Sequence, residues 1–225
     1  MKVKVFSFKG AEVEKKIIDS GLEISDSPDV VIVLGGDGTL LNSERRWPGV
    51  PKIVIRPKGT LRYFMYSMDD MDKIIEGLKN GNYEIEEEKK IKISHKGNEF
   101  EAMNEFTLRN ANQAHAIRFS VLVNGEKKGD YIGDGVVVAT PFGSTGYYHS
   151  VSRSSFKKGI GIAFNNTTEK ADPIVLNEDA KVEITLTRGK AFLTRDDDDN
   201  VIQVLENDKL EITSSENTAK IVRIK

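Results

Sequence analysis

A run of five apolar residues followed by a glycine-rich turn constrains the fold of this chain more than any other segment. Residues 30–34 read Val-Val-Ile-Val-Leu, and residues 35–39 follow directly as Gly-Gly-Asp-Gly-Thr. An uninterrupted apolar run of this length is typical of a parallel strand that is buried on both faces. Such a strand would deliver the turn to the carboxyl edge of an α/β sheet, where sheets of this kind place their ligands.

The turn at 35–39 has the composition of a phosphate-binding loop. Glycines tolerate positive φ and carry no side chain, so the backbone N–H groups around Gly36 and Gly38 can approach phosphate oxygens. Thr39 is expected to cap a helix over residues 40–45, whose N-terminus also favours anions. Asp37 would repel phosphates unless it holds Mg²⁺ or accepts a proton from an attacking hydroxyl. A purely structural turn is the alternative, but the whole combination favours the phosphate site.

Hydrophobic periodicity changes near residue 83. Before it, strands alternate with helices, as in an α/β domain. After it, almost every apolar segment has the pattern of a strand, and these segments are 83–94, 99–108, 117–123, 136–140, 160–164, 181–187, 191–194, 201–205, 209–213 and 219–224. We therefore expect an α/β N-terminal domain at 1–82 and a β-rich, β-sandwich-like domain at 83–225. The last strand could complete either domain.

A second segment rich in glycine and hydroxyl groups surrounds the strand at 136–140. Residues 133–147 read Gly-Asp-Gly-Val-Val-Val-Ala-Thr-Pro-Phe-Gly-Ser-Thr-Gly-Tyr. The hydroxyls of Thr140, Ser144 and Thr145 could cradle phosphate and ribose, and Tyr147 could stack on a base or donate a hydrogen bond. A hairpin rim followed by a capped helix fits this composition equally well.

Three segments together resemble the signature series of the NAD kinase family: residues 35–39, the pair Asn104-Glu105, and residues 133–147. The glycine turn alone also occurs in diacylglycerol kinases, sphingosine kinases and 6-phosphofructokinases, whereas the other two segments are specific to the NAD kinase branch. The resemblance implies the NAD kinase/diacylglycerol kinase-like fold. It also implies transfer of phosphate from ATP or polyphosphate to the adenosine ribose 2′-hydroxyl of NAD, with Mg²⁺ or another divalent cation.

Roles in that family carry over onto the matching residues of the turn and of the Asn-Glu pair. Asp37 resembles the catalytic carboxylate, which deprotonates the 2′-hydroxyl or organises the metal. The residues that would line the phosphate donor are Gly36, Gly38 and Thr39. Asn104 and Glu105 resemble the pair that contacts the nucleotide, with Asn104 at the adenine.

The resemblance also assigns roles in the second segment. Asp134 resembles a carboxylate that contacts ribose or nicotinamide across a subunit boundary, which implies a homodimer or homotetramer. Thr140 joins the nucleotide-binding set through its hydroxyl. The positions that resemble those around the adenine, ribose and diphosphate are Ser144, Thr145 and Tyr147. The family's Asp-Gly-Gln stretch falls on the four aspartates 196–199, among which Asp198 is the candidate.

Two segments depart from the family pattern. The family's Gly-Ile-Asn-x-Gly-x-Leu-Gly-Phe is replaced by Ile-Arg-Pro-Lys-Gly-Thr-Leu-Arg-Tyr-Phe at 55–64, and residues 150–155 lack two family glycines. Arg56, Lys58 and Arg62 could contact phosphate or lie on a solvated surface. The departures leave open a related kinase with a lipid or sugar acceptor, and a non-catalytic NAD- or NADP-binding protein. The retained Asp37 argues against the non-catalytic alternative.

The composition excludes several kinds of chemical site and of binding partner. The chain has no cysteine, which excludes disulfides, thiolate metal sites and cysteine nucleophiles. Its formal net charge is −2, with basic and acidic residues interspersed, so we expect no nucleic-acid partner. No apolar run is long enough to span a bilayer, and the N-terminal residues lack the apolar core of a signal peptide. We expect a cytoplasmic protein with no membrane partner.

Overall fold

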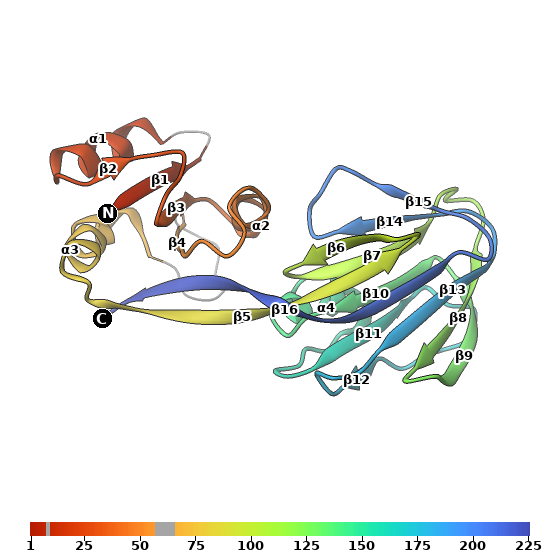
Figure 1. Ribbon diagram of the computed structural model, residues 1–225. Helices are drawn as coiled ribbons and strands as arrows, with labels where there is room; N and C mark the ends of the chain where they lie inside the picture. Colours follow the sequence, from red (N-terminus) through yellow and green to blue (C-terminus); the bar gives the residue numbers. More distant parts are fainter. Residues whose placement is uncertain (8–9, 57–65) are drawn as a thin grey trace. The chain divides into compact units, whose positions relative to one another are not determined.

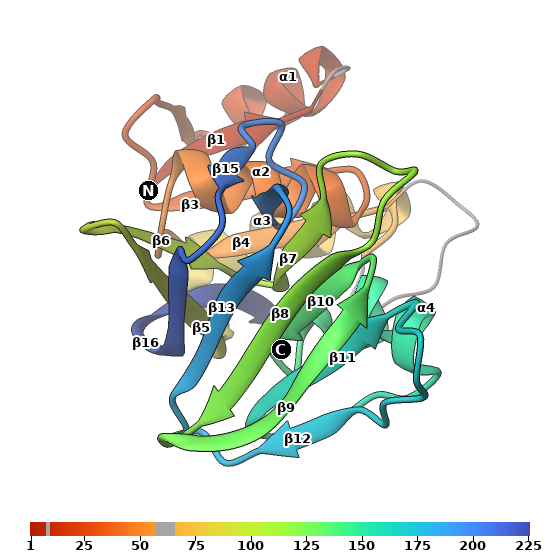
Figure 2. The same ribbon diagram turned by 90° about the vertical axis from the view of Figure 1, so that its right-hand side faces the viewer.

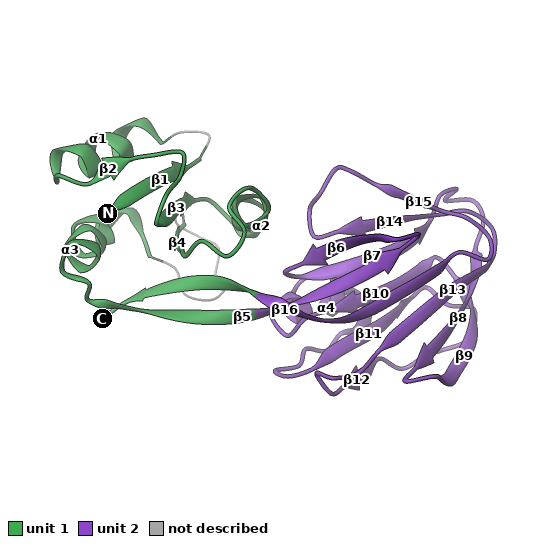
Figure 3. Ribbon diagram, viewed as in Figure 1, with its two compact units in different colours: residues 1–88, 218–225 green, residues 89–217 purple. Residues whose placement is uncertain are grey.

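The computed structural model describes residues 1–7, 10–56 and 66–225, and it divides the chain into two compact units (Figure 1, Figure 3). The first unit comprises residues 1–88 and 218–225, and the second comprises residues 89–217. Two long strands, β5 (Tyr83–His95) and β16 (Lys209–Ile224), continue from one unit into the other. The end of the chain therefore belongs to the first unit.

The first unit contains a parallel sheet. The consecutive strands of the order given next are all parallel to each other, including the pairing of Lys52 with Ile221 of β16. The strand order is β2 (Glu23–Ile24), β1 (Lys2–Phe6), β3 (Val30–Leu34), β4 (Lys52–Ile55) and the last part of β16. The apolar run predicted at 30–34 is a buried strand of this sheet, and so is the short run Lys-Ile-Val-Ile at 52–55.

Helices connect and cover these strands. The helices are α1 (Ala11–Asp19), α2 (Asp37–Arg46), the short 3-10 helix η1 (Met68–Asp70) and α3 (Met71–Asn80). Helix α3 buries Ile74 and Leu78 in the core of this unit. A Cβ on Gly77 would lie 2.6 Å from a methyl group of Ile224. Glycine at this position therefore lets α3 pack directly against the end of β16.

The second unit is built from two antiparallel sheets. One runs in the order β12 (Ile174–Leu176), β11 (Ile160–Asn165), β10 (Gly135–Ala139), β7 (Glu105–Asn110), β14 (Ala191–Arg195) and β15 (Ile202–Val204). The other joins the first part of β16 to β13 (Val182–Arg188), β8 (Ile117–Val123) and β9 (Glu126–Gly133), with β5 paired to β6 (Asn98–Ala102).

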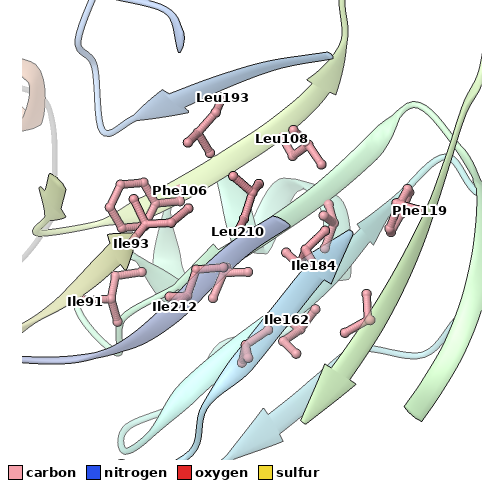
Figure 4. Close-up of a cluster of buried hydrophobic side chains, with 14 of the residues drawn as sticks. Ile91, Ile93, Phe106, Leu108, Phe119, Ile162, Ile184, Leu193, Leu210 and Ile212 are labelled. Carbon is pink, nitrogen blue, oxygen red and sulfur yellow. The ribbon is translucent and has the colours of Figure 1, made fainter. Parts of the chain in front are cut away.

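The inner faces of these two sheets form one hydrophobic core (Figure 4). One sheet contributes Phe106, Leu108, Ile162 and Leu193. The other sheet contributes Ile91, Ile93, Phe119, Ile184, Leu210 and Ile212. Alternating inward-facing residues of two sheets are the signature of a β-sandwich. The predicted fold class, an α/β part followed by a β-rich sandwich, is confirmed.

A short helix lies on the outer face of β10 and β11. The 3-10 helix η2 (Gly143–Thr145) leads into α4 (Tyr147–Ser152). Tyr148 of α4 is fully buried against Val137, Ala139 and Ala163. This packing fixes the glycine- and hydroxyl-rich segment to the end of β10.

The structure differs from the predicted elements at several places. The strand predicted at 99–108 is broken at 103–104 into β6 and β7. The segments 209–213 and 219–224 form one continuous strand, β16. Strand β9 was not predicted, because its first residues are mostly polar and it faces solvent.

Among residues 1–7, 10–56 and 66–225, no helix is long and apolar enough to cross a membrane.

Candidate functional site

The glycine turn lies at the carboxyl end of β3, beside the carboxyl end of its parallel neighbour β4. The N–H of Gly35 donates to the carbonyl of Ile55 at 3.0 Å, which holds the turn against the end of β4. A Cβ on Gly35 would overlap the side chain of Thr39, so only glycine lets Thr39 fold back over the turn. This is the sheet edge at which the sequence analysis placed a ligand site.

Helix α2 begins at Asp37, so the prediction that Thr39 caps a helix over 40–45 is wrong. The N-cap is Gly36, with φ of −93° and ψ of −164° and no capping side chain. Gly36 is thus extended and does not use the positive φ expected of the turn. The first N–H groups of the helix have no intrahelical acceptor, so this end of the helix carries positive partial charge beside Asp37, its first residue.

Asp37 is paired with an arginine from the neighbouring strand. Its carboxylate accepts a hydrogen bond from the Arg56 guanidinium, which directly follows β4. The Asp37 side chain is 34% exposed, whereas that of Arg56 is 7% exposed. Arg56 is therefore not the solvated surface residue considered above. The turn presents an accessible carboxylate with a buried, permanent positive charge beside it.

The far end of α2 is anchored to β4 as well. Glu44 of α2 and Lys52, the first residue of β4, form a buried ion pair, with side chains 5% and 0% exposed. The Lys52 ammonium also donates to the carbonyl of Trp47 at 2.6 Å, and Glu44 accepts from the N–H of Gly49 at 3.0 Å. The helix that carries Asp37 is thus tied to one strand at both of its ends.

Lys58 and Arg62, the predicted phosphate contacts, lie outside the described residues.

In the second unit, two of the predicted site segments are in direct contact. The N–H of Thr140 donates to the carbonyl of Asn104 at 2.8 Å, and the Thr140 hydroxyl donates to the carbonyl of Met103 at 2.7 Å. A Cβ on Gly143 would overlap the backbone of Asn104. The Asn104-Glu105 pair and the glycine- and hydroxyl-rich segment therefore form one cluster, as the resemblance implies.

Asp196 holds the break between β6 and β7. Its carboxylate accepts hydrogen bonds from the N–H groups of Met103, Asn104 and Glu105 at 3.0, 2.7 and 3.2 Å. Burial raises the pKa of the Asp196 carboxyl, and the three N–H donors oppose that rise. Asp198, the candidate of the sequence analysis, instead pairs with Arg195 at 2.8 Å. Asp196 is the residue of the aspartate run that positions the site.

The side chain of Asn104 carries an unsatisfied acceptor. Asn104 is 9% exposed, and its buried Oδ1 accepts no hydrogen bond from any described residue. Leaving a buried amide oxygen without a donor is costly, so this atom is available to accept from a bound ligand or from water. An exocyclic amine of a nucleobase is a donor of the right kind.

The hydroxyl groups of this cluster divide into two sets. Those of Thr140 and Ser144 are used within the protein: Thr140 Oγ1 accepts from the N–H of Gly143 at 3.0 Å, and Ser144 Oγ lies 2.7 Å from the carbonyl of Pro141. Thr145 and Tyr147 are half-buried, and the Tyr147 hydroxyl accepts from Asn165 at 3.3 Å. Thr140 and Ser144 thus shape the loop, while Thr145 and Tyr147 keep accessible surface.

Asp134 lies between β9 and β10. Its two carboxylate oxygens accept from the side-chain amides of Asn110 at 3.2 Å and Asn166 at 2.9 Å. The carboxylate is therefore held in a fixed orientation while the residue remains half-buried.

Comparison with solved structures identifies the fold of this chain. The whole chain superimposes on a crystal structure of an NAD kinase from Archaeoglobus fulgidus in complex with ATP, with a TM-score of 0.83, 19% identity and 94% of that chain covered. A yeast NADH kinase complexed with NADH matches the whole chain with a TM-score of 0.87 and 17% identity over 84% of its length. The fold is therefore that of the NAD kinases.

Sequence similarity identifies the family. The family model of the ATP-NAD kinase C-terminal domain matches residues 103–224, which is more than half of the chain. An NAD kinase of Thermoplasma acidophilum is 29% identical over 218 residues, covering 94% of this chain and 80% of that relative. The chain belongs to the NAD kinase family.

Proposed function

We propose that this chain is an NAD kinase, transferring a phosphoryl group from ATP or polyphosphate to the 2′-hydroxyl of the adenosine ribose of NAD. The observation that carries the proposal is the accessible Asp37 carboxylate at the start of α2, at the ligand-binding edge of the sheet, in a chain of this family. Proteins of the same fold have been crystallised with ATP and with NADH, which supports both classes of ligand.

The chemistry requires one base and several positive charges. The ribose oxygen attacks the terminal phosphorus, the bond from that phosphorus to the ADP oxygen breaks, and the hydroxyl proton passes to Asp37. N–H groups around Gly36, Gly38 and Thr39 would bind the donor's phosphates at the helix N-terminus. The Arg56 guanidinium, beside Asp37, adds a permanent charge that favours the transferring phosphoryl group.

A divalent cation, Mg²⁺ in the simplest case, fits this arrangement. No three acidic or histidine side chains gather at one point in the described parts of the chain. Mg²⁺ in kinases is commonly held by one or two carboxylates together with substrate phosphates, so Asp37 would be its protein contact. When bound, the ion would neutralise charge on the phosphates.

The cluster of the second unit would bind the adenosine half of the dinucleotide. The unsatisfied Oδ1 of Asn104 would accept from the adenine amine, with Glu105 beside it. Thr145 and Tyr147 would contact ribose and diphosphate, held in place by the loop bonds of Thr140 and Ser144.

The cytoplasmic location expected from the sequence stays a prediction.

Asp196 offers a test of how the Asn104-Glu105 pair is held. Replacing Asp196 with Ala leaves three N–H groups without an acceptor, so we expect the free energy of unfolding to fall by about 3 kcal/mol. Asp196→Asn keeps one acceptor oxygen and should cost less. The KM for NAD should rise in the same order, with Asp199→Ala, an exposed neighbour, as the control. Urea titration and steady-state kinetics measure both quantities, and an Asp196→Ala variant that matches the control would refute this role.

Asp134 offers a test of the oligomer. We propose that each site in a homodimer or homotetramer combines Asp37 of one subunit with Asp134 of another. Asp37→Ala and Asp134→Ala subunits should each be inactive alone, and co-refolding them in equal amounts should restore about a quarter of wild-type activity, because random mixing then forms intact sites. A mixture no more active than its separate components would contradict a shared site.

The proposal is tested by incubating the purified protein with NAD, Mg²⁺ and either ATP or polyphosphate. NADP should form with at least one donor, and EDTA should stop the reaction. A thermal-shift panel with NAD, a lipid and a sugar as acceptors separates the kinase alternatives, since NAD alone should stabilise the protein. Stabilisation by a lipid or sugar, without NADP formation, would refute the assignment.

A further inference from the structure

One groove in the second unit is lined by no residue of the proposed kinase site, although the Asn110 side chain that donates to His115 in its wall also donates to Asp134. It has a volume of about 650 Å³ and lies where β8 begins and β9 and β13 end, three strands that run side by side (Figure 2). Its lining includes Ile117 and Ile132 together with residues from 111–118 and 188–190. It shares no residue with the turn at 35–39 or with the Asn104 cluster.

The groove is strongly basic. Arg118, Arg188 and Lys190 line it, and no acidic residue does. Arg118 and Arg188 are direct partners across the β8–β13 pair, an arrangement in which like charges repel. None of the three forms an ion pair with a residue in 1–7, 10–56 or 66–225. All three side chains are exposed, so an anion that neutralises them could reach the groove directly from solvent.

The other end of the same strands shows the contrast. There, each of three lysines has an acidic partner within 3 Å. The pairs are Lys127–Asp130 at 2.6 Å, Lys128–Glu126 at 2.7 Å and Lys181–Glu211 at 2.7 Å. This sheet therefore neutralises its basic residues at one end and leaves them unneutralised around the groove.

Backbone contacts hold the walls of the groove in place. The N–H of Ala111 donates to the carbonyl of Lys190 at 2.9 Å, and the Asn110 amide donates to the carbonyl of His115 at 3.1 Å. Gly189 adopts a φ of +101°, which turns the chain tightly beside Ile117. The groove is thus formed before any ligand binds.

We propose that this groove is a second anion site, which binds a ligand carrying two or more phosphate groups. Guanidinium groups match phosphate oxygens in pairs, so the facing arginines fit one phosphate and Lys190 fits the next. The apolar floor at Ile117 and Ile132 can accommodate a nucleoside, so inorganic oligophosphate and nucleoside polyphosphate are the two sources of this chemistry. The site goes beyond the proposed kinase function and does not depend on it.

Backbone amide shifts of the ¹⁵N-labelled full chain test the proposal. Inorganic tripolyphosphate should move the signals of residues 111–118 and 188–190, with an affinity that falls at least tenfold in the double variant Arg118→Gln/Arg188→Gln. The matched variant Lys127→Gln/Lys128→Gln removes two charges from the other end of the sheet and should bind as wild type does. A parallel titration with a non-hydrolysable ATP analogue distinguishes the sources, since tighter binding of the analogue would point to a nucleotide.

Three results would overturn the proposal. Shifts confined to 35–39, 103–105 and 133–147 would place all phosphate binding at the kinase site. Unchanged affinity in the arginine variant would show that the groove does not bind tripolyphosphate. Equal shifts with sulfate would indicate an adventitious ion only. NADP formation by the arginine variant should equal that of wild type, so loss of the groove and failure of the kinase assignment remain distinguishable.

Discussion

Replacing Asp37 with Asn should lower kcat/KM for NADP formation by about a thousandfold, because it removes the proton acceptor for the ribose hydroxyl. That loss corresponds to about 4 kcal/mol of transition-state stabilisation. Asn nearly matches the shape of Asp and can still accept from Arg56, so the fold should persist. Most of the loss should appear in kcat, because NAD is held mainly by other residues.

The control for this experiment is Asp19→Asn, an exposed aspartate at the end of α1. Its activity should match that of wild type. Both variants should give the circular dichroism spectrum of wild type, which separates loss of chemistry from loss of the fold. An Asp37→Asn enzyme that keeps more than a tenth of wild-type kcat/KM would show that another group accepts the proton.

The second large effect concerns the buried pair at the far end of α2. Lys52→Met keeps the bulk of the side chain but removes the ammonium group from beside the buried Glu44 carboxylate. Breaking a buried pair in this way typically costs about 3–5 kcal/mol of unfolding free energy. Trp47 is the only tryptophan of the chain and accepts from Lys52, so its fluorescence during urea titration reports this unit directly.

Two comparisons make the Lys52 result specific. Glu44→Leu combined with Lys52→Met removes both charges and should recover most of the lost stability. Lys4→Met breaks an ion pair of the same unit in which Asp26 is 90% exposed, and it should cost no more than about 1 kcal/mol. If Lys52→Met were as mild as Lys4→Met, the pair would not anchor α2.

The strands of the fold could be predicted where burial alone sets the pattern. The apolar runs at 30–34 and 52–55 have the pattern of strands buried on both faces, and both are strands. Residues 117–123 alternate as a half-buried strand does. Strand β9 could not be predicted from the sequence, because its polar residues face water and its hydropathy then resembles that of a loop. The break at 103–104 depends on a carboxylate more than ninety residues away, which no local pattern records.

The candidate site was predictable in its residue types but not in its internal bonds. The resemblance singled out Asp37, Asn104 and the segment 133–147, yet it gave no sign that Thr140 and Ser144 use their hydroxyls on the backbone. Lys52, the first residue of the run at 52–55, is fully buried, which hydropathy does not predict for a lysine. Such pairings depend on which side chains the fold brings together, and only tertiary structure supplies that information.

The most direct test of the central claim is the position of the new phosphate on the dinucleotide. Purified protein is incubated with NAD, Mg²⁺ and ATP, and the product is analysed by mass spectrometry and by reduction with a dehydrogenase specific for NADP. We expect one added phosphate on the adenosine ribose 2′-hydroxyl, formed about a thousandfold more slowly with Asp37→Asn under the same conditions. Dinucleotide that binds but stays unphosphorylated with either ATP or polyphosphate, or phosphate on another hydroxyl, would contradict the assignment.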